Sequence, residues 1–178
     1  ELAYMTGILP IKKYGEHSAI NIFREFSIIN PGRLTSDFGF TEDEVKDLCK
    51  TYRMDFEKVN YWYDGYLLND MHIYNPMAVR ECMESGDFQS NWTGTETYEA
   101  LKIYMDMIYD GLKDAVKAML GNARCKVNTR KFQNDMTTFQ SKDDILTLLV
   151  HLGYLTCDRT TEEVFIPNQE IAQEFLNA

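Results

Sequence analysis

The stretch "SKDDILTLLVHLGYLTCDRTTEEVFIPNQEIAQEFLNA", residues 141–178, carries the clearest local pattern in the chain. Ser141 stands where a helix cap is needed, and the helix that follows should stop at Gly153. A strand, a polar turn and a second strand come next, and Asn168 is placed to cap a last helix. We therefore expect a helix–β-hairpin–helix unit over 141–178. This order is winged-helix-like, and it also occurs in plain α+β domains.

Upstream of this unit, the pattern predicts mostly short, capped helices. Thr41 and Glu44 have capping-box spacing, so the hydroxyl can accept from an amide while the carboxylate reaches back. Asp55 starts a second helix that should end near Tyr63.

Three further helices are expected before residue 141. After a brief extended piece, Asn75 caps a helix with Pro76 at its first position, and Gly86 follows its end. Apolar stripes then predict two longer helices over 97–109 and 111–121, joined by a short turn.

The chain opens on an apolar segment, "LAYMTGILPI", that has the character of a strand. It lacks an initial methionine, and we interpret it as the start of a piece cut from a longer protein. The expected fold class is mainly α with some β (α+β), with a terminal strand over 1–14, a helical lid-like domain over 15–140 and the unit over 141–178. "SAINIFREF", residues 18–26, is expected to be the first helix of the lid.

Composition excludes several classes of protein. The 178 residues are 44% hydrophobic and 13% aromatic, which is enough for a sizeable core. The formal net charge of -10 would repel a phosphate backbone, so nucleic acid is a disfavoured partner. The longest apolar runs are shorter than the roughly 20 residues of a membrane span. We expect a soluble, cytoplasmic protein that does not enter a membrane.

The cysteines and histidines are too scattered to form a metal or redox motif. Cys49, Cys82, Cys125 and Cys157 make no CxxC pair, and we expect reduced, partly buried thiols. His151 lies in an apolar helix, where a packed or tip-exposed histidine is favoured over a metal ligand.

The sequence also lacks GxxxxGK[ST], GxGxxG, HExxH and GxSxG, so we assign no catalytic residue, no metal site and no cofactor to this piece. The carboxylates of "TEDEVKD" (41–47) and "SKDD" (141–144) stand in first helical turns, where acids complement the helix dipole.

"NYWYDGY", residues 60–66, allows two interpretations. Burial among aromatics would raise the pKa of Asp64 towards that of a general acid, and a hydrolase could pair it with Asp143 or Asp144. Asp-Gly is also a preferred turn pair, and the aromatics before it have helical spacing. The turn, locked by core aromatics, is the favoured interpretation. Trp92, Tyr98 and Tyr104 likewise fit a peptide groove or base stacking, although aromatics at such spacing are more often core.

Seven short motifs in a fixed order carry a family resemblance: "YMTGILPIKKYG", "FGFTEDEV", "WYDGY", "YNPMAV", "NWTGTETYEAL", "LTLLVHLGYLT" and "VFIPN". In this order the chain resembles a family of uncharacterised bacterial proteins with an N-terminal AAA-ATPase-like domain and often a C-terminal PD-(D/E)XK nuclease-like domain. The resemblance covers nearly the whole chain and implies that it is the latter part of the ATPase-like region.

The resemblance also implies partners and one cofactor-binding position. ATP and Mg²⁺ would bind the parent protein through an upstream core, and the nuclease-like domain would follow downstream. Thr6 would lie near the position where such ATPases place a sensor residue. The helices after it would form a lid, and the chain would couple nucleotide state to an attached effector domain without being catalytic.

Two other roles remain as alternatives. One is a protein–protein interaction or oligomerisation module that self-associates through aromatic surface. The other is DNA contact through the winged-helix-like end, for which "KVNTRKF" offers Lys126, Arg130 and Lys131. Glu162 and Glu163 stand at the tip where a DNA-reading wing carries basic residues, so we expect no measurable DNA affinity at physiological salt.

Overall fold

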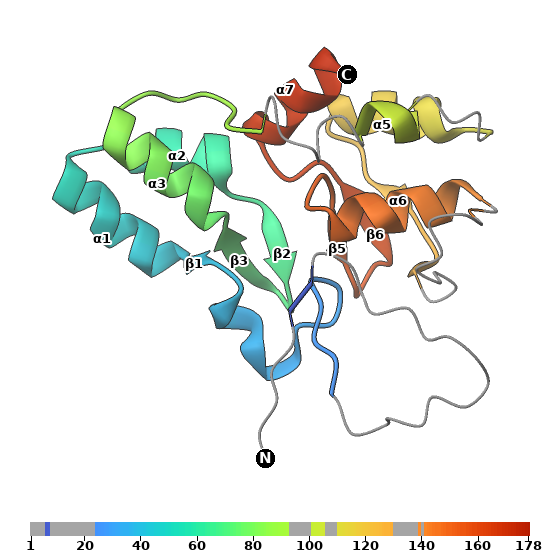
Figure 1. Ribbon diagram of the computed structural model, residues 1–178, viewed down its shortest axis with the longest axis horizontal. Helices are drawn as coiled ribbons and strands as arrows, with labels where there is room; N and C mark the ends of the chain where they lie inside the picture. Colours follow the sequence, from blue (N-terminus) through green and yellow to red (C-terminus); the bar gives the residue numbers. More distant parts are fainter. Residues whose placement is uncertain (1–5, 8–23, 93–100, 106–109, 130–138, 140) are drawn as a thin grey trace.

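In the computed structural model the chain forms two small units, each with a three-stranded antiparallel sheet and its own helices (Figure 1). The structure describes residues 6–7, 24–92, 101–105, 110–129, 139 and 141–178. The expected α+β class is therefore confirmed. The first unit lies on the left of Figure 1 and the second on the right, with α7 between them at the top.

The first unit packs its helices against a sheet of order β1-β3-β2. Tyr66 pairs with Ile73 across the β2–β3 hairpin, and Phe40 pairs with Tyr74 on the other side of β3. The elements are the 3₁₀ helix η1 (Gly32–Asp37), β1 (Phe40–Thr41), α1 (Glu42–Tyr52), α2 (Phe56–Tyr63), β2 (Tyr66–Leu68), β3 (Met71–Tyr74) and α3 (Pro76–Ser85).

The second unit has a sheet of order β4-β6-β5. Residues 101–105 are helical, and Leu101 and Tyr104 belong to its core. The remaining elements are α5 (Leu112–Leu120), β4 (Cys125–Lys126), α6 (Lys142–His151), β5 (Thr156–Asp158), β6 (Glu163–Phe165) and α7 (Gln169–Asn177).

Most helix starts are where the capping residues predict them. Thr41 and Ser141 both make full capping boxes, and Asp55, Asn75 and Asn168 each accept a hydrogen bond from a first-turn amide. These local bonds use donors that a helix start leaves unsatisfied, which is why short sequence signals are sufficient to place the helices.

The hairpin between β2 and β3 was not predicted. Its two-residue turn is Asn69-Asp70, with φ of 47° and 64°. Positive φ at both turn positions matches the twist of a two-residue hairpin, and Asn and Asp tolerate it better than other non-glycine residues. The first unit consequently contains a three-stranded sheet beside the helices expected in this part of the chain.

The boundary between the two larger hydrophobic cores lies between Met83 and Leu101, upstream of residue 140. One core comprises buried residues from Val45 to Met83, and a second joins Leu101, Leu112 and Val127 to α6, the second sheet and α7. A small third cluster consists of Tyr66, Leu68 and Ile73. Cys125 of β4 pairs with Val164 of β6. Two strands give little stability alone. The hairpin therefore takes a third strand from upstream of 141.

Several expected elements fall wholly or partly on residues outside the described ranges. These are the strand over 2–11, except Thr6 and Gly7, the helix over 18–26, except Arg24–Phe26, and parts of the 97–109 helix. Arg24–Phe26 are not helical. Within the described residues, no helix is both long and apolar enough to cross a membrane.

Candidate functional site

The two sheets approach each other edge to edge, with β2 beside β5 (Figure 1). The amide of Leu67 on β2 donates to Oγ1 of Thr156 on β5 at 2.8 Å, so a side chain takes the place of a strand carbonyl. The hydroxyl of Tyr66 donates to the carbonyl of Gly153 at 2.9 Å. We call this junction the seam; it comprises residues 61–67 and 89–92 on one side and 153–156 and 167–174 on the other.

Gly65 brings the backbones of the two units into direct contact at the seam. It has φ of +110°, and a Cβ built on it would lie 1.9 Å from the carbonyl oxygen of Pro167. Only glycine combines this φ with such an approach. "WYDGY" and "VFIPN", which are distant in sequence, are therefore adjacent in space.

Gly153 plays a similar role against Trp92. Its φ is +84°, and a built Cβ would lie 3.1 Å from the far edge of the Trp92 ring. Trp92 also packs on Tyr154, with ring centroids 4.9 Å apart. Trp92 and Gly153, which belong to two different motifs, thus meet in the same seam. The Trp92 ring packs against the second unit there.

The seam also contains two fully buried carboxylates, Glu170 and Glu174, one turn apart on α7. Oε1 of Glu170 accepts from the amide of Asn91 at 3.1 Å, and Oε1 of Glu174 accepts from the hydroxyl of Ser90. Tyr63 holds the same segment from the other side, because its hydroxyl donates to the carbonyl of Gln89 at 3.1 Å. The segment 89–91 is therefore tied to both units.

Burial raises the pKa of Glu170 to about 7, because it disfavours the charged form of the carboxyl group. The amide of Asn91 and the nearby side chains of Trp92 and Asn91 oppose this rise. Oε2 of Glu170 is buried and has no donor in hydrogen-bonding geometry among the described residues. Chemically, Glu170 can take up or release a proton close to neutral pH.

Two cavities border the seam. The larger, about 260 Å³, is polar and lies between the turns of the two hairpins, with Asn69 and Asp70 on one side and Arg159 and Thr160 on the other. The smaller, about 190 Å³, is apolar and is lined in part by Tyr66, Ile73 and Trp92.

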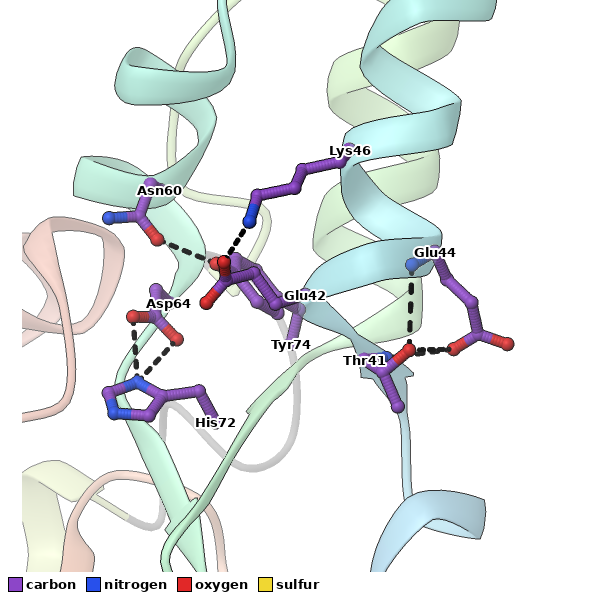
Figure 2. A network of polar contacts seen from close by, with 8 residues as sticks. All are labelled: Thr41, Glu42, Glu44, Lys46, Asn60, Asp64, His72 and Tyr74. Carbon is purple, nitrogen blue, oxygen red and sulfur yellow. Dashed lines mark hydrogen bonds and ion pairs between the residues drawn. The ribbon is translucent and has the colours of Figure 1, made fainter.

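Asp64 lies at the end of α2, outside the buried part of the seam. Both of its carboxylate oxygens contact Nδ1 of His72, at 2.9 and 3.1 Å (Figure 2). Nearby, the Tyr74 hydroxyl donates to Oδ1 of Asn60 at 2.6 Å, and Lys46 pairs with Glu42. The side chain of His72 is 52% exposed and that of Asp64 is 17% exposed, so the pair lies at the edge of the surface and fastens the β2–β3 hairpin to the end of α2.

Replacing Asp64 with Asn is expected to lower the free energy of unfolding by less than about 1 kcal/mol, because exposed ion pairs contribute little and Asn can still accept from His72. Urea denaturation of the two proteins measures the difference. A loss of several kcal/mol would mean that Asp64 has a structural role that this geometry does not explain.

The other candidate acids are used locally. Asp144 completes the capping box with Ser141, and Oδ2 of Asp143 accepts from the amide of Asn128 at 3.1 Å. Asp64 has His72 as its partner, so the structure gives no support for the hydrolase grouping. These positions confirm the structural interpretation of the first-turn acids.

Two of the remaining candidates belong to the packing of the second unit. His151 is half-buried at the end of α6, and burial lowers its pKa to about 4. Tyr104 is buried and meets Phe139 edge-on.

Other candidates are exposed, paired or outside the described ranges. Thr6 is exposed. Lys126 pairs in register with Glu163. Tyr98, Arg130 and Lys131 lie outside the described residues.

The four cysteines are free thiols, three of them buried, as expected. No group of three or more His, Cys, Asp or Glu residues in the described part of the chain could hold a metal ion.

No family model matches the chain, and neither the curated proteins nor the solved structures contain a match. The seam therefore has to be interpreted from its own chemistry.

The buried acids of α7 were not singled out from the sequence, although a signal was present. Glu170 and Glu174 have the same spacing as Ile171 and Phe175, and all four residues are buried. An apolar stripe that includes two acids at helical spacing indicates a helix face packed against polar partners.

Proposed function

We propose that this chain is a non-catalytic coupling module of an AAA-ATPase-like protein, passing nucleotide state from an ATPase core to an effector domain. The observation that carries the proposal is the seam, where two separately packed units are joined through polar anchors, two close glycine contacts and the packing of Trp92 on Tyr154. Polar interfaces of this kind between domains permit relative motion more readily than a shared hydrophobic core.

The order of the motifs supports the assignment to this family, and residues of "WYDGY", "LTLLVHLGYLT" and "VFIPN" meet at the seam. The succession α6, β5, β6 and α7 supports a winged-helix-like second unit with β4 as an added strand. A cytoplasmic location belongs to the same proposal, as do the nuclease-like neighbour and a sensor role for Thr6.

Isothermal titration with Mg-ATP tests the proposal. This chain alone should give no binding heat, whereas a longer protein that includes the upstream core should bind ATP. Micromolar binding by this chain alone, or ATP hydrolysis by it, would overturn the proposal.

The alternative is an interaction or oligomerisation module. Large apolar side chains are exposed on both units, among them Tyr61 at 64% and Leu176 at 69%. Light scattering across a range of concentrations separates the two functions: coupling within one chain predicts a constant mass, and self-association predicts a mass that rises with concentration.

A further inference from the structure

We propose that Glu170 is a proton-dependent latch on the seam: its neutral carboxyl group holds α7 against the 89–92 segment, and ionisation loosens that contact. This rests on the proposed coupling function, because it names what would regulate the joint between the two units.

The geometry places Glu170 at the centre of the joint. Glu170 is fully buried, and its Oε1 accepts a hydrogen bond from the backbone amide of Asn91 at 3.1 Å. The 89–92 segment is also where the chain leaves the first unit, directly after α3 and Phe88. Any separation of the units must therefore either break the bond from Asn91 or carry α7 along with it.

Among the residues that the structure describes, none that interacts with Glu170 supplies a compensating positive charge. The groups that interact with it are Glu174 on its own helix, Tyr63 on α2, Tyr66 on β2, Cys82 on α3, and Asn91 and Trp92 in the linking segment. Each is acidic or uncharged at neutral pH. α5 also packs on α7, but it turns the apolar residues Leu112, Ala115, Val116 and Met119 inward, while Lys113, Asp114 and Lys117 are exposed.

A buried carboxylate without a cationic partner destabilises the closed seam, whereas the neutral acid does not. In an open seam the carboxyl group is hydrated and should titrate near its ordinary value of 4.5, while in the closed seam burial raises its pKa to about 7. At pH well below 4.5 the carboxyl group is neutral in both states, so its titration does not oppose the closed state. As pH rises above about 4.5 the open state is increasingly favoured by ionisation, and this effect reaches its full size somewhat above pH 7.

Hydrogen exchange measured by NMR on the whole chain tests the latch. The reporters are the amides of Asn91 and Leu67, which bond across the seam, and those of Val79 and Leu152, which bond inside the two units. After correction for the intrinsic exchange rate, the opening constant at the seam should rise on the order of fifty-fold between pH 5 and pH 8.

Two variants make the test specific. Glu170→Gln keeps the shape and cannot ionise, so the rise in seam opening between pH 5 and pH 8 should be much smaller than in the wild type. Glu84→Gln, on the exposed face of α3, is the matched control and should behave like the wild type. Unchanged opening between pH 5 and pH 8 in the wild type, or an equal rise in Glu170→Gln, would overturn the latch.

A second measurement does not depend on the variant's folding. The carboxyl carbon of Glu170 in the wild-type protein should titrate near pH 7 by NMR, and a midpoint near 4.5 would contradict the latch. Neither experiment contains nucleotide, so failure of the latch is distinguishable from failure of the coupling function, which the Mg-ATP titration tests.

Discussion

Replacing Gly65 with alanine is expected to lower the free energy of unfolding by about 3 kcal/mol, among the largest effects of any conservative change in this chain. An L-residue at φ of +110° is strained, and its Cβ would lie 1.9 Å from the Pro167 carbonyl oxygen. That atom belongs to the backbone, so it cannot rotate away. The overlap must be relieved by moving α7 and the strands of the seam apart.

Gly86→Ala is the matched control for Gly65→Ala. Gly86 has φ of +76°, and a Cβ there meets nothing within 4 Å. Only backbone strain should therefore lower the free energy of unfolding of Gly86→Ala, by about 1 kcal/mol. Gly153→Ala should fall between the two, since the Trp92 ring can shift. Urea denaturation of the three variants gives the order. Equal losses in Gly65→Ala and Gly86→Ala would mean that the Pro167 contact is absent in solution.

Leu148→Ala is expected to destabilise the second unit by about 2–5 kcal/mol. Leu148 is fully buried in the core that α6 shares with the second sheet and α7, and truncation leaves a cavity there. Leu176→Ala removes the same atoms from a side chain on α7 that is 69% exposed, and it should cost less than about 0.5 kcal/mol. Thermal and urea denaturation of both variants measures the contrast.

Local signals were sufficient for many of the helices and for one hairpin. Thr41, Asp55, Asn75, Ser141 and Asn168 each satisfy donors within their own first turn, so their effect can be read from a few residues. The strands of the C-terminal hairpin were likewise bounded by a polar turn that their own sequence contains.

The seam could not be derived in this way, because its partners are far apart in the sequence. Tyr66 and Gly153, which share a hydrogen bond, are 87 residues apart. Gly65 in an Asp-Gly pair indicates a turn, but nothing local indicates that Pro167 lies against it. The pairing of β4 with β6 depends in the same way on the packing of the second core.

The aromatic stretch 60–66 was only partly interpreted. Tyr63 and Tyr66 are buried as expected, whereas Tyr61 is 64% exposed and contacts Gln169 through its hydroxyl at 3.1 Å. Asp64 is neither a general acid in a pocket nor only a turn residue, since it pairs with His72. Helical spacing indicated that aromatics such as Tyr63 face the core, but it did not indicate that His72 on β3 pairs with Asp64 at the end of α2.

The central claim is that two separately packed units meet at a seam and can open there. Native-state hydrogen exchange in Leu148→Ala tests it most directly, with the amides of Val59 and Val79 reporting on the first unit and those of Ala115 and Leu152 on the second. The account predicts that exchange in the second core accelerates by roughly thirty-fold or more, while exchange in the first core changes only a few-fold. An equal acceleration of all four amides would show one cooperative core and would contradict the account.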